Sequence, residues 1–266
     1  MDIYLSSLAG VLKPLNKFII RAASEGFKNI EILDEWKHRL SSNERIRELK
    51  ELRDSYSLQY LVHAPFDGIN ISTPQLYLRE CSLKLIKKSM ESAHKVESRI
   101  VVIHSGFKSP LDYYKPRTSW NIFLNVLRFV NKVAGSLDVY VGVENLPKYS
   151  FALISSHKDA VSLLEHMQSL DRIGLTFDVG HSNTIDGSEV EAFLDHLGNH
   201  IIHVHLHDNN GEIDDHLPIG FGSIRWEAFT NKVSRLKLIG GMTLEVLSLD
   251  AARESLKTLS RMLNTK

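Results

Sequence analysis

The sequence predicts an α/β protein that folds as a single-domain (β/α)8 TIM barrel over residues 1–266. Eight short runs rich in β-branched and aliphatic residues alternate with longer amphipathic stretches, which is typical of a parallel sheet with helical crossovers. A length of 266 residues fits one such barrel. No linker, low-complexity tract or charge block divides the chain, so one domain is expected.

In chain order, the runs that predict strands lie at residues 3–6, 29–33, 60–63, 100–104, 139–144, 174–178, 201–205 and 241–245. The segments that predict helices lie at residues 43–55, 76–96, 120–135, 156–170, 188–197, 224–236 and 249–263. Most of these helical segments repeat apolar residues at intervals of three and four. One face of each helix is therefore expected to pack on the sheet.

Composition and charge narrow the class of protein. Lys and Arg together number 32, as do Asp and Glu, so the chain lacks the overall basic field that draws proteins onto phosphate backbones, although a local patch could suffice. The lone cysteine, Cys81, cannot form an internal disulfide, and nothing at the N-terminus resembles a signal peptide or a membrane span. We therefore expect a cytoplasmic protein without a membrane partner, and the oligomeric state stays open.

Polar side chains lie at the ends of six of the predicted strands, at the point where each apolar run ends. They are His63, His104, Glu144, Asp178, His205 and Glu245. In a (β/α)8 barrel these strand ends meet on one face, where barrel active sites are built. Any one of them alone could be a hydrogen-bonded core group or a helix cap. Together, carboxylates and imidazoles out of water would repel or stay unsatisfied unless a cation or substrate organised them, and metal is the simplest organiser.

The densest polar stretch runs from residue 203 to residue 222. Alternation along a strand would place His203, His205 and His207 on one face. His203 lies deepest and is expected to be a core histidine bonded to a neighbour, whereas His207 belongs to the following loop if the strand ends before it. Asp214 and His216 lie in a loop that could turn back over the site, and the alternative is an ordinary solvated loop.

A further histidine follows Asp178 at a spacing of three residues. This spacing can carry His181 to the same rim, where it would face a second metal or a substrate oxygen. A mixed set of oxygen and nitrogen ligands is suited to Zn, Mn or Co and does not distinguish among these metals. The predicted cofactor is therefore a divalent metal of open identity.

These residues occur in motifs that resemble the xylose isomerase-like TIM barrels, the superfamily of sugar and sugar-phosphate isomerases and epimerases and of endonuclease IV, the family-2 AP endonucleases. The resemblance runs over nearly the whole chain. The motifs are Val62-His63-Ala64-Pro65, Val102-Ile103-His104-Ser105-Gly106, Val143-Glu144-Asn145, Asp178-Val179-Gly180-His181, His205-Leu206-His207-Asp208, Asp214-Asp215-His216 and Leu244-Glu245. Each motif alone is weak evidence for the family, and it is their order along the chain that makes the resemblance specific.

The resemblance to the isomerases and epimerases implies one metal site and a proton-transfer mechanism. It places the ligands on Glu144, Asp178, His205 and Glu245. The metal would hold the oxygens of a sugar or sugar phosphate while Glu144 and Glu245 take and return a carbon-bound proton. One departure is that the Arg which many epimerases carry before a Pro-Gly is absent from residues 214–218.

The resemblance to endonuclease IV implies an alternative, a three-zinc phosphodiesterase whose partner is abasic DNA. The additional ligands would be His63 and His104 for one ion and His181, Asp214 and His216 for another. The Asp-Arg-His of the endonucleases reads Asp214-Asp215-His216 here, which replaces a positive charge near the phosphate with a negative one. The leading expectation is therefore an isomerase or epimerase with one to three ions of Zn, Mn or Co. A barrel without catalysis is a third possibility with little support, because no ligand position is missing.

Overall fold

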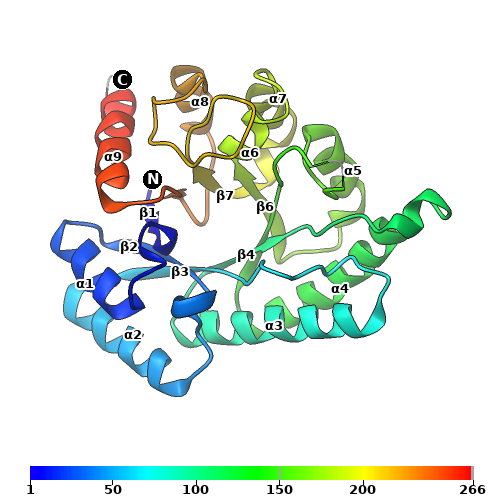
Figure 1. Ribbon diagram of the computed structural model, residues 1–266, viewed down its shortest axis with the longest axis horizontal. Coiled ribbons are helices and arrows are strands. Elements are labelled where there is room, and N and C mark those ends of the chain that lie inside the picture. Colours follow the sequence, from blue (N-terminus) through cyan, green and yellow to red (C-terminus); the bar gives the residue numbers. More distant parts are fainter. Residues whose placement is uncertain (150, 265–266) are drawn as a thin grey trace.

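The computed structural model describes residues 1–149 and 151–264, and it is a closed barrel of eight parallel strands with helices around it (Figure 1). The strands are β1 (Ile3–Ser6), β2 (Asn29–Leu33), β3 (Gln59–His63), β4 (Ile100–His104), β5 (Tyr140–Glu144), β6 (Ile173–Asp178), β7 (Ile201–Leu206) and β8 (Met242–Leu244). Each strand pairs with the next, and β8 pairs with β1 to close the barrel. The predicted fold is thus confirmed.

Most of the surrounding helices follow a strand and lead to the next one. The α-helices are α1 (Leu15–Ser24), α2 (Asn43–Tyr56), α3 (Leu76–Lys95), α4 (Thr118–Leu137), α5 (His157–Met167), α6 (Val179–Asn183), α7 (Glu189–Leu197), α8 (Trp226–Val233) and α9 (Leu249–Asn264). Short 3-10 helices are η1 (Ser7–Gly10), η2 (Trp36–His38), η3 (Pro110–Tyr113) and η4 (Gly198–His200).

The predicted strands agree with the observed ones to within one residue at either end, and the predicted helices to within three. Two helices, α1 and α6, have no counterpart in the prediction. Helix α1 begins after Pro14 without a side-chain cap, so its start carries no polar signal. Helix α6 has only five residues, too few for a periodic pattern, and its first turn is capped by Asp178, whose side chain accepts from the His181 amide.

The barrel interior is apolar at one level and polar at the next. A small cluster inside the barrel contains Tyr4, Leu61, Ile100 and Val102, while the larger core cluster lies between the strands and the helices. Side chains alternate along a strand, so His63 and His104, each two residues beyond a member of the small cluster, also point into the barrel. The apolar layer therefore supports the polar one.

Strand register aligns the polar ends. On β4 and β5, His104 lies opposite Glu144. Between β6 and β7 the register shifts after Leu175, and this irregularity brings Asp178 opposite His205. Without the shift Asp178 would lie opposite Val204, whose side chain points to the other face of the sheet.

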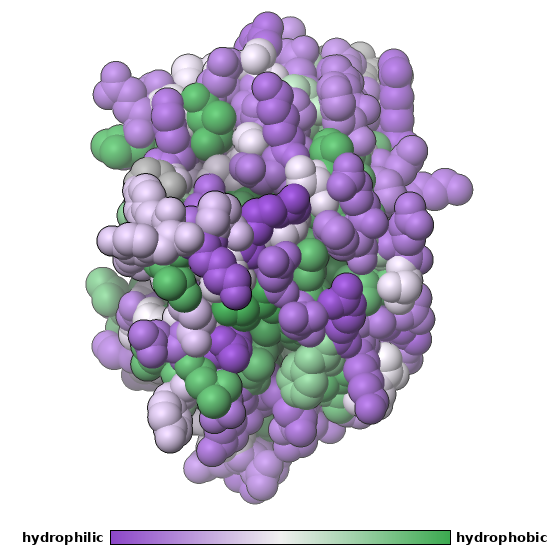
Figure 2. All heavy atoms as spheres, turned by 90° about the vertical axis from the view of Figure 1, so that its right-hand side faces the viewer, coloured by the Kyte–Doolittle hydropathy of each residue, from purple (hydrophilic) through white to green (hydrophobic). Residues whose placement is uncertain are grey.

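The outer surface is mixed in polarity. Figure 2 shows one side face of the barrel as mostly hydrophilic, with apolar side chains in small groups between hydrophilic ones. Within residues 1–149 and 151–264, no helix has the length and apolar character needed to cross a membrane.

Candidate active site

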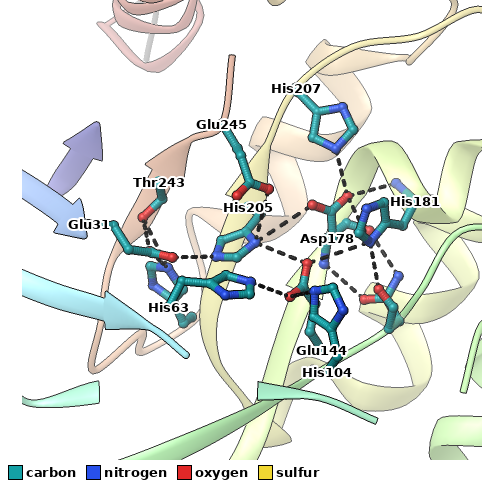
Figure 3. Close-up of polar contacts among 12 residues, drawn as sticks. Glu31, His63, His104, Glu144, Asp178, His181, His205, His207, Thr243 and Glu245 are labelled. Atoms are coloured by element: carbon teal, nitrogen blue, oxygen red, sulfur yellow. Dashed lines mark hydrogen bonds and ion pairs between the residues drawn. The ribbon is translucent and has the colours of Figure 1, made fainter. Parts of the chain in front are cut away.

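The structure brings all nine residues of the predicted site together at the carboxyl ends of the strands, and most of them are labelled in Figure 3. Strands β3 to β7 each contribute one side chain at or next to the last residue, and the others follow β8 or come from α6 and the loop between β7 and α8. In this order they are His63, His104, Glu144, Asp178, His205, Glu245, His181, Asp214 and His216. Pairings between carboxylates and imidazoles join them into one network.

Three carboxylates surround one ring nitrogen of His205. Its Nδ1 lies 3.2 Å from Glu144 Oε1 and 3.4 Å from Glu245 Oε2. The same nitrogen is 3.7 Å from Asp178 Oδ2, a buried atom with no hydrogen-bond partner. Carboxylates gathered out of water repel one another unless positive charge lies among them. Three carboxylates and one imidazole nitrogen around a common point therefore fit a divalent cation.

The two oxygens of Glu144 face different partners. Oε2 lies 3.1 Å from His63 Nε2 and 3.3 Å from His104 Nε2. Oε1 faces His205 and also lies 3.5 Å from His181 Nδ1. A buried carboxylate with this arrangement can bridge two positive centres.

Asp214 gathers a second group of donors. Its Oδ2 lies 3.2 Å from His181 Nε2 and 3.4 Å from His216 Nε2, and its buried Oδ1 has no hydrogen-bond partner. The side chains of Asp214 and His216 are only 19% and 17% exposed, so the interpretation of these two residues as solvated loop residues is wrong. His207, one residue beyond β7, is fully buried with Nε2 3.1 Å from Asp178 Oδ1. His207 Nε2 also lies 3.6 Å from Asp214 Oδ1, so Asp178 is linked through His207 to the second group as well as to His205 of the first.

Three of the histidines are anchored in the same way, by a main-chain carbonyl that accepts from Nδ1. The pairs are His63 with Ala64 at 2.8 Å, His181 with Asn145 at 2.7 Å, and His216 with Glu245 at 2.7 Å. Because Nδ1 carries the hydrogen donated to the carbonyl, Nε2 is the nitrogen left for the site, and each of these Nε2 atoms faces a carboxylate. This is the tautomer that a metal-binding histidine needs.

The charges of the site offset one another. Burial acts to raise the pKa of Glu144, yet the adjacent His205 and His104 hold that pKa well below its ordinary value. Burial acts to lower the pKa of His205 and of His216, yet neighbouring carboxylates raise the first well above its ordinary value and the second to about 9. Ionised carboxylates thus lie beside the protonated imidazoles of His205 and His216, and a cation has to displace these protons to bind.

A cavity of about 380 Å³ opens over these side chains. Its polar lining is His63, His104, Glu144, His181, Asp214, His216 and Glu245, and its apolar lining includes Leu8, Leu33, Phe66, Phe107, Leu146 and Leu247. The Phe66 ring stacks on the His104 ring with centroids 5.0 Å apart. In the part of the chain that the structure describes, no Lys or Arg lines this cavity. Its size suits a small molecule.

Sequence reasoning missed Glu31, which touches the site from inside the barrel. Glu31 is fully buried in β2 and accepts from both His205 and His203. The expectation that His203 is a core histidine bonded to a neighbour agrees with these contacts. The only signal for Glu31 is an acidic residue between Ile30 and Ile32 in the middle of a strand, and attention to strand ends overlooks it.

Comparison with known proteins identifies the family. The family described as the xylose isomerase-like TIM barrel matches residues 19–262. This chain belongs to that family. The match covers nearly the whole barrel, from α1 to α9, and confirms the resemblance that the motifs carry.

Several relatives span the chain. Uncharacterized protein MJ1311 of Methanocaldococcus jannaschii is 32% identical over 273 residues, which cover 100% of this chain and 92% of that protein. Fructoselysine 3-epimerase of Escherichia coli O157:H7 is 22% identical over 239 residues, 86% of this chain and 84% of that protein. Among solved structures, a D-tagatose 3-epimerase-like protein matches with a TM-score of 0.91 at 31% identity, covering 100% of this chain and 98% of the other. An L-ribulose 3-epimerase matches with a TM-score of 0.82 at 18% identity, covering 99% of this chain and 94% of the other.

Proposed function

We propose that this protein is a divalent-metal-dependent epimerase of an unphosphorylated keto-sugar, in which Glu144 and Glu245 transfer the proton. Epimerases of keto-sugars and of fructoselysine occur among the similar proteins, and these names support the reaction class. The arrangement of this chain's own side chains supports the assignment of roles.

The observation that carries the proposal is the placement of Glu144 and Glu245 around one point. Both lie within 3.4 Å of His205 Nδ1, and both line the cavity. Glu144 ends β5 and Glu245 follows β8, so the two reach the site from separate parts of the barrel. Epimerisation needs two such groups, because a proton leaves one face of a carbon and returns to the other.

The environment of Glu144 keeps its carboxylate in the ionised form, which is the form that can accept a proton. Its pKa is held well below the ordinary value, so the carboxylate is ionised at neutral pH and can accept a carbon-bound proton. His63 and His104 face its Oε2 and orient the carboxylate. To return a proton, Glu245 has to carry one at the start and give it to the opposite face of the carbon, so that the proton taken from the substrate ends on Glu144 and the reverse reaction exchanges the two roles.

The metal-binding residues would be those around His205 Nδ1, namely Glu144, Asp178, His205 and Glu245. A bound Zn, Mn or Co ion would supply positive charge that stabilises the substrate oxygen next to the carbon that loses its proton. Further ions would use the donor sets already described, so that the total would be roughly one to three ions per chain. These sets are His63 and His104 with Glu144, and His181 and His216 with Asp214.

The cavity lining favours a sugar without a phosphate group. Phosphate is ordinarily held by Arg or Lys side chains, and neither lines the cavity among the residues that the structure describes. Apolar side chains such as Phe66 and Phe107 are instead suited to the C–H faces of a sugar. A sugar phosphate is therefore the less suitable substrate.

The phosphodiesterase alternative is not favoured, although its nine ligand positions lie together. DNA binding depends on cationic contacts to phosphates, and within the described ranges the cavity lining offers none. Asp215 stands where the resemblance expects a positive charge. The similar proteins with a named activity reported above are sugar epimerases.

Solvent-proton exchange tests the proposal. Protein loaded with Zn, Mn or Co is incubated in D2O with D-tagatose, L-ribulose or fructoselysine, and NMR follows deuterium at C3 and formation of the epimer. We expect both signals with at least one of these sugars and slower reaction with a phosphorylated ketose. Metal-loaded protein that exchanges no carbon-bound proton in any of them, yet incises an abasic duplex, would contradict the proposal.

A further inference from the structure

Glu31 is bound to His205 inside the barrel, next to the candidate active site (Figure 3). Its Oε1 accepts from His205 Nε2 at 3.1 Å. Its Oε2 accepts from His203 Nε2 at 2.8 Å and from Thr243 Oγ1 at 2.6 Å. All four residues have 0% of their surface exposed. Both carboxylate oxygens are thus engaged, away from water.

His205 is held differently from the other anchored histidines. His63, His181 and His216 donate from Nδ1 to a main-chain carbonyl and direct Nε2 at the site. His205 donates from Nε2 to the side-chain carboxylate of Glu31 and directs Nδ1 at the site. The orientation of this ring therefore depends on one side chain, which can be substituted.

We propose that Glu31 is a positioning residue for the metal site, which keeps a hydrogen of His205 on Nε2 and so leaves Nδ1, among the surrounding carboxylates, as the nitrogen that would bind the ion. The inference rests on the proposed function, because it concerns the ion that His205 would hold. Glu31 does not line the cavity, and it faces Nε2 of His205, the ring nitrogen on the side away from Glu144 and Glu245.

A carboxylate acceptor does more than a main-chain carbonyl can. Its hydrogen bond to the imidazole is charge-assisted and therefore stronger, and it makes the opposite ring nitrogen a better electron donor to a metal. Full burial keeps this charge unscreened by water. His203 and Thr243 occupy Oε2, so Oε1 stays directed at His205.

The test is Glu31→Gln, which keeps the shape of the side chain and removes its charge. An amide offers one acceptor oxygen and one NH2 donor, so it cannot accept from both His205 and His203. The control is Glu189→Gln. Glu189 is also a buried glutamate bonded to a histidine, with Oε1 2.9 Å from His157 Nδ1, and it lies on the outer helices rather than in the site.

Two quantities are measured on the folded proteins. The first is the dissociation constant for Zn²⁺, obtained by competition with a chelator. The second is the NMR resonance of the His205 Nε2–H proton in the zinc-loaded protein. We expect Glu31→Gln to raise the dissociation constant about 10–100-fold and to move the resonance upfield, because a neutral acceptor replaces a charged one. Glu189→Gln is expected to change neither, and a role limited to stability would not move the resonance.

The outcomes separate this inference from the proposed function. A dissociation constant and resonance in Glu31→Gln equal to those of the wild type would overturn the inference alone. Weakened zinc binding in Glu31→Gln, in a protein that epimerises none of the sugars, would support the inference and contradict the proposed function. A wild type that binds no divalent ion would overturn both.

A second variant covers the case in which Glu31→Gln does not fold. Thr243→Val matches the shape of threonine and removes one of the donors that hold Glu31 in place. We expect a smaller rise in the dissociation constant, with a displaced His205 resonance. Unchanged values for both in Thr243→Val would overturn the inference.

Discussion

His181 Nε2 lies 3.2 Å from Asp214 Oδ2, so the long loop after β7 is tied to the turn that follows β6. His216 of the same loop faces the same oxygen at 3.4 Å. These contacts form a second donor set beside that of His205, and Asp178 lies between the two. The site therefore has room for more positive charge than one ion supplies.

Metal content should reflect these donor sets. We expect protein purified without chelator to hold more than one ion per chain, and His216→Ala to lose the ion at Asp214 while the ion at His205 stays. His63→Ala tests the third position in the same way, because its Nε2 faces Glu144 Oε2. Elemental analysis gives the number of ions per chain. About one ion per chain, unchanged by either substitution, would limit binding to the set around His205.

The stability of the metal-free protein should depend on pH through His216. Burial acts to lower the pKa of His216, but its hydrogen bond to Asp214 raises that pKa from 6.5 to about 9. A raised pKa means that the folded state binds the proton more tightly than the unfolded state does. The stabilisation is therefore complete below about pH 6.5 and is lost as the pH rises through about 9.

The measurement for His216 is urea unfolding of the metal-free wild type and of His216→Gln between pH 6 and pH 10. We expect the wild type to be the more stable at pH 6, by on the order of 3 kcal/mol, and the difference to vanish near pH 10. A difference that stays constant over this range would show that the pair with Asp214 does not set the protonation of His216.

Close packing at Gly180 offers a test of the geometry without metal. A Cβ at Gly180 would lie 1.9 Å from Cε1 of His207, so any side chain there must displace the ring that faces Asp178. We expect Gly180→Ala to lower the free energy of unfolding by about 1–3 kcal/mol. Gly135, on the exposed side of α4, has nothing within 4 Å of a Cβ, so Gly135→Ala should raise it by about 0.5–1 kcal/mol. Urea unfolding of the wild type and of both variants measures these free energies. Equal changes in the free energy of unfolding for Gly180→Ala and Gly135→Ala would contradict the close packing of Gly180 against His207.

The strand ends could be predicted from sequence because their signal is local. An apolar run followed by His63, His104 or Glu144 identifies both a strand and the residue at its end. Parallel strands in a closed barrel then bring those ends together without further information. The convergence of the site is therefore a consequence of periodicity and topology.

The remaining features depend on contacts between residues of different strands, which no single segment of sequence shows. The register shift that places Asp178 opposite His205 is a property of the pair β6 and β7, and it cannot be predicted from the sequence of either strand alone. Glu31 resembles an isolated charge in an apolar strand until His203 and His205 are placed beside it. His207 lies beyond β7, as expected, but its full burial was not predicted, because it depends on contacts with His181 of α6 and with Asp214.

Glu144→Gln and Glu245→Gln test whether these two glutamates transfer the proton. Each glutamine keeps the size of the side chain and removes the basic oxygen, so we expect each variant to lose epimerisation by about 10²–10⁴-fold. Exchange of the substrate's carbon-bound proton with D2O, followed by NMR, is the measurement. Because both glutamates also face His205, elemental analysis must show which ions each variant retains. Exchange that persists in both metal-loaded variants would rule out the two-glutamate mechanism, whereas its loss in both, with the buried Glu189→Gln control active, would assign the proton transfer to this pair.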